Sequence, residues 1–204
     1  MKTKGLAILT AWLFILLSAG ISSAAYVSSL EQISPDAVNY TFRTDFHHFW
    51  NVDNMYMEPA TGEAEGSLQF AGYGDEDDFS DFVSGNIALI ERGHFSFAYK
   101  MNNAFNAGAI GVIIFYNEGG SRELWEHALS EETYIPALIT TRALGLDLLS
   151  LLDSGHDVVM KMSVQAASAV PEPATLLLLG AGLLAVAGSS RKERFSSTSR
   201  ASTK

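Results

Sequence analysis

The fold of this chain is decided by residues 85–115, which read GNIALIERGHFSFAYKMNNAFNAGAIGVIIF. Ile87–Glu91 is a continuous apolar run, as expected for a strand that is buried on both faces. Ser96 is a suitable cap for a helix, and the residues after it recur at helical spacing on one face: Phe97, Met101, Ala104 and Gly108. A second apolar run, Ile110–Tyr116, follows. The stretch predicts a strand, a helix and a strand packed as one unit.

The alternation of strands and helices continues toward the C-terminus. Pro136–Thr140 opens another apolar strand. Thr141 is a suitable cap for a helix whose inward face carries Leu144, Leu148 and Leu151. Val158–Val164 alternates apolar and polar residues, which predicts a last strand buried on one face. Four strands interspersed with two helices after residue 86 indicate α/β packing.

The segments before residue 85 are less regular. Val38–Phe42 alternates apolar and polar residues and predicts a half-buried strand, and Leu68–Phe70 predicts a short one. Between them, Pro59–Gly66 (PATGEAEG) predicts a turn. Gly72–Asp81 (GYGDEDDFSD) predicts an acidic loop. Together with the C-terminal half, these segments predict one mixed α/β domain.

The stretch 85–116 resembles the protease-associated (PA) domain. The shared features are an apolar strand, an Arg-Gly turn, a Ser-Phe-x-x-Lys helix start and an Ala-Gly before the next strand, here Arg92, Gly93, Ser96, Phe97, Lys100, Ala107 and Gly108. Residues 135–152 match the later Ile-Pro strand and Gly-x-x-Leu helix of that family. The resemblance extends over about 34–164. It implies a β-sheet or sandwich core flanked by short helices.

The residues of the PA motif have a structural and a functional interpretation. Gly93 permits a tight turn after a buried strand, and Ala107 and Gly108 permit close helix–strand packing. Arg92 is expected to bond to loop carbonyls or to a carboxylate. The alternative is a direct ligand role for Arg92 or the adjoining loop. Two departures from the family pattern are Asn86, where Lys is common, and Phe95, where many members have Cys.

The N-terminal residues 1–25 have the pattern of a secretory signal peptide. Lys2 and Lys4 precede the apolar run Leu6–Leu17, and small residues follow it. Their spacing predicts cleavage after Ala24 or Ala25. An uncleaved membrane anchor is the alternative, although twelve apolar residues are short for a span of about 20.

The C-terminal residues form a second targeting pattern at 170–194. Pro171, Glu172 and Pro173 precede a short apolar segment, Ala174–Gly188, and a basic cluster follows at Arg191, Lys192 and Arg194. Because basic residues remain in the cytoplasm, the cluster predicts a short transmembrane helix with the preceding domain outside. Residues 195–204 form a polar tail. The PA domain with an N-terminal extension is thus expected over 26–169.

This arrangement resembles a PEP-CTERM sorting signal. The resemblance implies a Gram-negative bacterium, a signal peptidase, and an exosortase-type enzyme that recognises the motif and cleaves near it. It also implies a precursor held transiently in the inner membrane, and a product that reaches the cell surface or outer envelope, or is secreted. The polar tail is a departure from the usual pattern.

Composition excludes several classes of protein. The 204 residues contain no cysteine, which excludes a disulfide scaffold, a zinc ribbon and a cysteine nucleophile. The net charge is −10 for the whole chain and −15 for residues 26–170, so no nucleic-acid partner is expected. The sequence has no Gly-x-Ser-x-Gly, no His-Glu-x-x-His and no phosphate loop. We therefore expect no catalytic residues and no resident cofactor.

Two groups of residues are candidates for ligand binding. The acidic loop offers Asp75, Asp77, Asp78 and Asp81 as ligands for calcium, and a solvated loop is the alternative. The aromatic group could stack on sugars or close one end of the core: Tyr40, Phe42, Phe46, Phe49, Trp50 and Tyr56. Adjacent His47 and His48 point to opposite faces if extended, which disfavours a shared metal.

The function expected from these observations is that of a non-enzymatic, surface-sorted interaction module. Its partner would be an extracellular protein, peptide or polysaccharide. One alternative is an accessory or substrate-presenting subunit of a separate secreted peptidase. A second alternative is a matrix protein that binds calcium and polysaccharide.

Overall fold

The computed structural model describes residues 26–49, 57–118 and 127–167, which form a mixed α/β fold. The elements in chain order are β1 (Tyr26–Ser34), β2 (Val38–Asn39), β3 (Phe46–His48), β4 (Gly62–Phe70), the 3₁₀ helix η1 (Glu76–Phe79), β5 (Ile87–Glu91), α2 (Phe97–Asn106), β6 (Gly111–Phe115), β7 (Ala137–Thr140), α3 (Arg142–Asp153) and β8 (Val159–Ala166).

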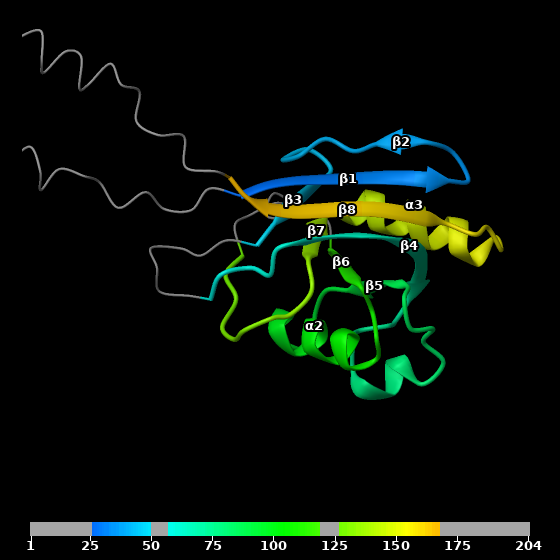
Figure 1. The fold of residues 1–204 in the computed structure, drawn as a ribbon. Helices are drawn as coiled ribbons and strands as arrows, with labels where there is room; N and C mark the ends of the chain where they lie inside the picture. The colour runs from blue at the N-terminus through cyan, green and yellow to red at the C-terminus, as the bar shows by residue number, and fades with distance from the viewer. Residues whose placement is uncertain (1–25, 50–56, 119–126, 168–204) are drawn as a thin grey trace, which may run out of the picture. The chain divides into compact units, whose positions relative to one another are not determined.

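The described strands form a single sheet in the order β2-β1-β8-β4-β5-β6-β7-β3. The strands β4, β5, β6 and β7 are parallel. β8 lies between β1 and β4 and is antiparallel to both. β4 joins the two regions, because its first half pairs with β8 and its last three residues pair with β5. Figure 1 shows β1 and β8 side by side along one layer, with the parallel strands beneath them.

The sheet curls so that β1, next to one edge, approaches β3 at the opposite edge. Ser28 of β1 is hydrogen-bonded through Oγ to Nδ1 of His48 on β3, at 2.9 Å. The rings of Tyr26 and His48 lie 5.9 Å apart, edge to face. Within the described ranges β1 and β3 are not paired through their backbones, so these side chains close the seam between them.

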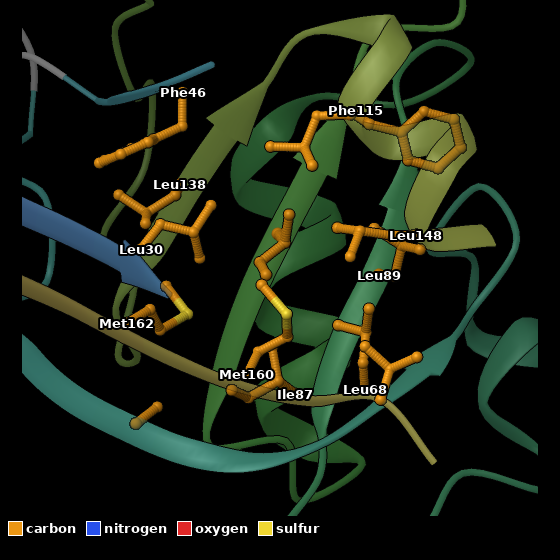
Figure 2. Close-up of a cluster of buried hydrophobic side chains, with 14 of the residues drawn as sticks. Leu30, Phe46, Leu68, Ile87, Leu89, Phe115, Leu138, Leu148, Met160 and Met162 are labelled. Carbon is orange, nitrogen blue, oxygen red and sulfur yellow. The ribbon is translucent and has the colours of Figure 1, made fainter. Parts of the chain in front are cut away.

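The larger core lies inside the curl, between the parallel strands, β8 and α3. Alternate residues of β5 and β6 point into it, and Leu144 and Leu148 of α3 cover it. Figure 2 shows these side chains converging: Leu30, Phe46, Leu68, Ile87, Leu89, Phe115, Leu138, Leu148, Met160 and Met162. At Gly145 the helix lies directly against β6, since a Cβ there would be 2.1 Å from Cβ of Phe115.

The second core lies on the other face of the parallel strands, under α2. Ala88 and Ile90 of β5 and Val112 and Ile114 of β6 pack there against buried Met101 and Ala104. The predicted cap is confirmed, since Ser96 Oγ accepts from Tyr99 N at 3.3 Å. Because α2 covers one face of β5 and β6, and β8 and α3 cover the other, the sequences of both strands are continuously apolar.

Helix α2 ends two residues before Gly108, the last position that the periodicity places on its buried face. Ala107 is its C-cap, and Gly108 follows in the left-handed conformation at φ 87°. A Cβ at Gly108 would lie 2.4 Å from Ser84 Oγ. Gly108 is therefore required by the turn and by Ser84, rather than lying on the buried helix face.

Two predictions for the N-terminal half are wrong. Pro59–Gly66 is not a turn, because Gly62 begins β4, where Ala64 is buried against β8. Strand character also ends at Asn39, and Val38 is 38% exposed instead of half-buried. The cause is that β2 is an edge strand that pairs only at two residues of β1.

The predicted targeting segments lie outside the described residues. This applies to the signal peptide with Ala24 and Ala25, to the sorting motif 171–173, and to the basic cluster 191–194. Within the described ranges, no helix is both long enough and apolar enough to cross a membrane. The predicted domain boundaries remain predictions.

Candidate functional site

The loops that follow the parallel strands gather at one edge of the sheet. Because β4, β5 and β6 are parallel, the segments after Phe70, Glu91 and Phe115 leave on the same side. Two of these loops meet directly, since Glu91 N donates to the Gly72 carbonyl at 2.8 Å. A rigid sheet with loops at the carboxyl ends of its strands is a common position for binding residues.

Lys100 of α2 holds the first loop in place. Its side chain is fully buried, and Nζ donates to the carbonyls of Tyr73 and of Glu91, the latter at 3.1 Å. Asn103 adds a bond from Nδ2 to the Gly74 carbonyl at 3.0 Å. Burial lowers the pKa of Lys100 to about 8, and Asp78 opposes this shift. Through these contacts Lys100 ties the loop after β4 to the end of β5.

Four rings form a surface above Lys100, which we call the aromatic patch: Tyr73, His94, Phe95 and Tyr99. The Tyr73 and His94 centroids are 4.2 Å apart, and those of Phe95 and Tyr99 are 5.0 Å apart. His94 is exposed and Phe95 is 41% exposed. Lys100 Nζ lies 5.7 Å from the Tyr73 ring and 5.6 Å from the Phe95 ring.

The turn that presents this patch depends on Gly93. Gly93 has φ 114° and His94 has φ 61°, so two consecutive residues are in the positive-φ region. A Cβ at Gly93 would also lie 3.1 Å from Nδ2 of Asn117. The conformation explains the Arg-Gly pair, because a side chain at Gly93 would be strained.

Two carboxylates of the acidic loop accept hydrogen bonds from backbone N–H groups of the same loop. Asp78 Oδ2 accepts from Tyr73 N at 2.9 Å and from Asp75 N at 3.0 Å. Asp75 Oδ1 accepts from Glu76 N at 2.9 Å and from the Tyr99 hydroxyl at 2.8 Å. Asp77 and Asp81 are exposed. In the part of the chain that the structure describes, no three His, Asp or Glu residues are arranged to hold a metal. Calcium binding therefore stays a prediction that no contact described here supports.

Arg92 lies on the other side of the same turn, in a cluster of rings. Its guanidinium carbon is 4.9 Å from the Tyr116 ring centroid and 5.9 Å from that of Phe97. Its Nε is fully buried, with no hydrogen-bond acceptor among the described residues. The predicted bond of Arg92 to a loop carbonyl or a carboxylate is not observed in these ranges.

His127 completes this second cluster. Its Nε2 is hydrogen-bonded to the hydroxyl of Tyr116, and its ring is 5.0 Å from that of Phe97. Burial lowers the pKa of His127 to about 4, and the positive charge of Arg92 and proximity to His47 add to the shift. His127 is thus neutral at pH 7.

The aromatic group proposed for sugar binding is mainly part of the core. Phe46 and Phe49 are at most 1% exposed, and Tyr40 and Phe42 pack against the larger core. The remaining two, Trp50 and Tyr56, lie outside the described residues. Buried rings cannot stack on a ligand, so Phe46 and Phe49 are excluded.

His47 and His48 lie closer together than an extended strand predicts. Their ring centroids are 5.3 Å apart, and both rings contact Phe42. Both residues are buried.

Sequence reasoning missed the partners that make both clusters. The sequence pattern did not assign Tyr73 and Tyr99 to the aromatic patch, or Tyr116 and His127 to the cluster around Arg92. The available signal was the position of Tyr73 between Gly72 and Gly74, which both have positive φ. His127 carries no such signal, because only the fold brings it to Tyr116.

The fold and these loops define the class of the domain. Residues 56–148 match the family model of the PA domain, and residues 169–192 match that of the PEP-CTERM protein-sorting motif. The chain therefore contains a PA domain followed by a PEP-CTERM sorting motif. The motif identifies an exported protein that passes through the membrane to the cell surface or outer envelope, after processing by exosortase-type machinery.

The curated relatives that match this chain are peptidases. An aminopeptidase of Pseudomonas aeruginosa is 33% identical over 123 residues, which are 55% of this chain and 23% of that protein. A C5a peptidase of Streptococcus pyogenes is 58% identical over 43 residues, or 21% of this chain and 4% of that protein. The chain thus spans about a quarter or less of these relatives.

Solved structures support the fold. An aminopeptidase from Aneurinibacillus sp. strain AM-1 matches with a TM-score of 0.57 and 24% identity, over 72% of this chain and 33% of that one. A zinc aminopeptidase from Bacillus subtilis matches with a TM-score of 0.51 and 20% identity, over 81% and 38%. At these identities the likeness concerns the fold alone.

Proposed function

We propose that this surface-sorted protein is a binding module whose PA domain contacts a protein or peptide ligand without catalysing a reaction. The observation that carries this proposal is the aromatic patch. Phe95 and His94 are exposed on a turn whose conformation Gly93 permits and whose base Lys100 fixes by its bond to the Glu91 carbonyl. Rigid, exposed aromatic side chains contribute much of the energy of protein interfaces, because they bury a large area at little entropic cost.

The acidic helix η1 adds charge beside the patch. Asp75 is bonded to the hydroxyl of Tyr99, and Glu76 and Asp77 are exposed and form no ion pair with any described residue. A negative surface that is not neutralised within the domain favours ligands that carry basic groups next to apolar ones.

A histidine next to a serine can activate the hydroxyl for catalysis, and Ser28 and His48 form the one such contact in the described ranges. The proposal of a non-catalytic role rests on the unsuitability of this pair. Ser28 lies within β1, in register with Val164 of β8, so its backbone is fixed by the sheet. His48 is buried, and burial lowers its pKa to about 4. So weak a base is poorly suited to activate a hydroxyl at neutral pH. This contact closes the seam of the sheet instead.

The binding proposal can be tested by peptide selection on the immobilised exported protein. We expect selected peptides to lose affinity at least tenfold with Phe95→Ala. Phe105→Ala is the matched control, because Phe105 is 43% exposed but lies at the other end of α2. Equal losses with the two variants, or none with either, would contradict the proposal.

The absence of catalysis is tested with fluorogenic aminoacyl and ester substrates. We expect the purified protein to turn over neither class. Turnover that persists through purification and disappears with His48→Ala would overturn this part of the proposal.

A second candidate is an accessory subunit of a separate secreted peptidase. It is favoured by the matched aminopeptidase of P. aeruginosa, in which the similar region is 23% of a longer protein. Co-purification of the exported protein with an active peptidase, lost with Phe95→Ala, would support this candidate.

A further inference from the structure

We propose that Arg92 and His127 form a subsite for a single peptide carboxylate, either a C-terminus or an Asp or Glu side chain. This inference rests on the proposed binding function. It specifies the chemical group that the cluster around Arg92 binds. The two clusters share the turn 92–95, so one peptide could contact both.

The first argument is the state of the Arg92 side chain. Arg92 is partly exposed, yet its Nε is fully buried without an acceptor among the described residues, and it forms no ion pair with any of them. Buried charged groups are normally paired, so an arginine left in this state needs an explanation. Stacking on Tyr116 fixes the guanidinium plane, and a planar guanidinium binds a carboxylate with two parallel bonds.

The second argument is the composition of the cluster around Arg92. Its neighbours are the rings of Phe97 and Tyr116, and the neutral His127. Burial lowers the pKa of His127 most, and the two described groups that add to this shift, Arg92 and His47, are not negative. Among the described residues, the contacts of the Arg92 guanidinium are thus with rings and not with a carboxylate.

The overall charge determines the class of ligand. A polyanion such as a uronate polysaccharide would be repelled by 21 acidic residues in the region 26–170. A peptide with one carboxylate carries little net charge and can still present an apolar group to Phe97. A peptide acid therefore fits both the positive charge of Arg92 and the negative net charge of the domain.

The experiment compares small acids with their amides on the full chain. The probes are N-acetylphenylalanine, its amide, and N-acetylglutamate α-amide, and the readouts are the affinity and the Nε–H NMR signal of Arg92. We expect an acid to bind at least tenfold more tightly than N-acetylphenylalaninamide and to shift the Arg92 signal. The two acids distinguish a C-terminal carboxylate from a side-chain carboxylate.

Variants separate the subsite from the rest of the protein. Arg92→Gln should lose the preference for the acid, and Arg92→Lys should retain part of it. Lys161→Gln, which removes an ion pair with Glu65 on the antiparallel region, is the control and should change nothing. If Arg92→Gln does not fold, the acid–amide comparison and the Arg92 signal in the parent protein decide.

Proton linkage supplies an independent readout. A bound carboxylate raises the pKa of the neighbouring imidazole, so affinity for the acid should increase as the pH falls from 7 to 5. His127→Gln should remove this increase while retaining part of the binding.

Three outcomes would overturn the inference. They are equal affinity for acid and amide, equal binding of inorganic phosphate, and tighter binding of polygalacturonate than of the peptide acids. None of these results bears on peptide selection by the aromatic patch. Conversely, if Phe95→Ala left selection unchanged, acid binding at Arg92 would still be measurable.

Discussion

At the scale of single residues, Lys100 shows how a buried charge can organise a surface. Its ammonium group replaces water with two backbone carbonyls, one in the loop after β4 and one at the end of β5. The sequence placed Lys100 in a motif but did not indicate its partners. Those partners are backbone atoms of Tyr73 and Glu91, and backbone atoms carry no signal in the residue pattern.

Gly145 gives a sharp test of packing between α3 and β6. Gly145→Ala should lower the free energy of unfolding by about 1–3 kcal/mol, because the new Cβ would overlap Cβ of Phe115, which cannot rotate away. The better helix propensity of alanine, about 1 kcal/mol, offsets only part of this. Urea unfolding followed by circular dichroism would measure the difference.

The control for this substitution is Gly62→Ala. Its new Cβ would meet Cδ of Pro136 at 3.4 Å, an ordinary contact, so stability should change little. An unchanged midpoint for Gly145→Ala would mean that α3 does not lie against Phe115.

Stability should also depend on pH through two histidines. His48 and His127 have pKa values of about 4 in the folded protein, below the ordinary 6.5. The unfolded chain therefore binds more protons below pH 6.5, and stability should fall as the pH decreases from 6.5 to 4. Each unit of difference between the folded and unfolded pKa lowers the free energy of unfolding by about 1.4 kcal/mol once the pH is below both pKa values. Urea midpoints measured at several pH values would show the decline.

A histidine variant shows whether His127 causes this loss of stability at low pH. His127→Asn should flatten the curve between pH 6.5 and 4 relative to the parent protein. Parallel curves for this variant and the parent would show that His127 does not titrate as described.

At the scale of elements, helices were easier to predict than strands. Both helix starts follow from Ser96 and Thr141, whose side-chain oxygens accept the expected backbone bonds. β4 was missed because Gly, Glu and Ala are weak strand formers. Its conformation is imposed by pairing with β8, which is distant in sequence.

The cap of α2 can be tested directly. Ser96→Ala should cost about 1 kcal/mol, because the Tyr99 amide loses its acceptor, and Ser96→Asp should restore stability. Ser150→Ala, on the exposed side of α3, is the control. Equal stability of Ser96→Ala and the parent in urea would contradict the assigned cap.

At the scale of the whole molecule, the sorting motif and most of the domain were recognisable from sequence. The second cluster of the site was not, because Arg92 and His127 are 35 residues apart and follow different elements. Their proximity depends on the parallel arrangement of β5 and β6, which a local pattern cannot specify.

The sorting motif makes a prediction for the entire protein. Replacing Pro171, Glu172 and Pro173 by alanine should leave export intact but retain a larger form in the inner membrane. The apolar segment and basic cluster would still anchor the precursor, while the handle of two prolines and a carboxylate would be lost. Cell fractionation with intact-mass measurement would detect the retained form. Unchanged release of a trimmed product would show that the motif acts as an ordinary linker.

The pairing of β1 with β8 has a consequence for how this domain can be joined to others. Tyr26 stands opposite Ala166, so the polypeptide enters and leaves the domain at neighbouring points. Both points lie near Gly62, where β4 begins, whereas the aromatic patch follows the ends of β4 and β5. Such a domain can be inserted into a loop of a host protein without stretching either junction, and the loops that carry the aromatic patch then lie at the end away from the insertion point.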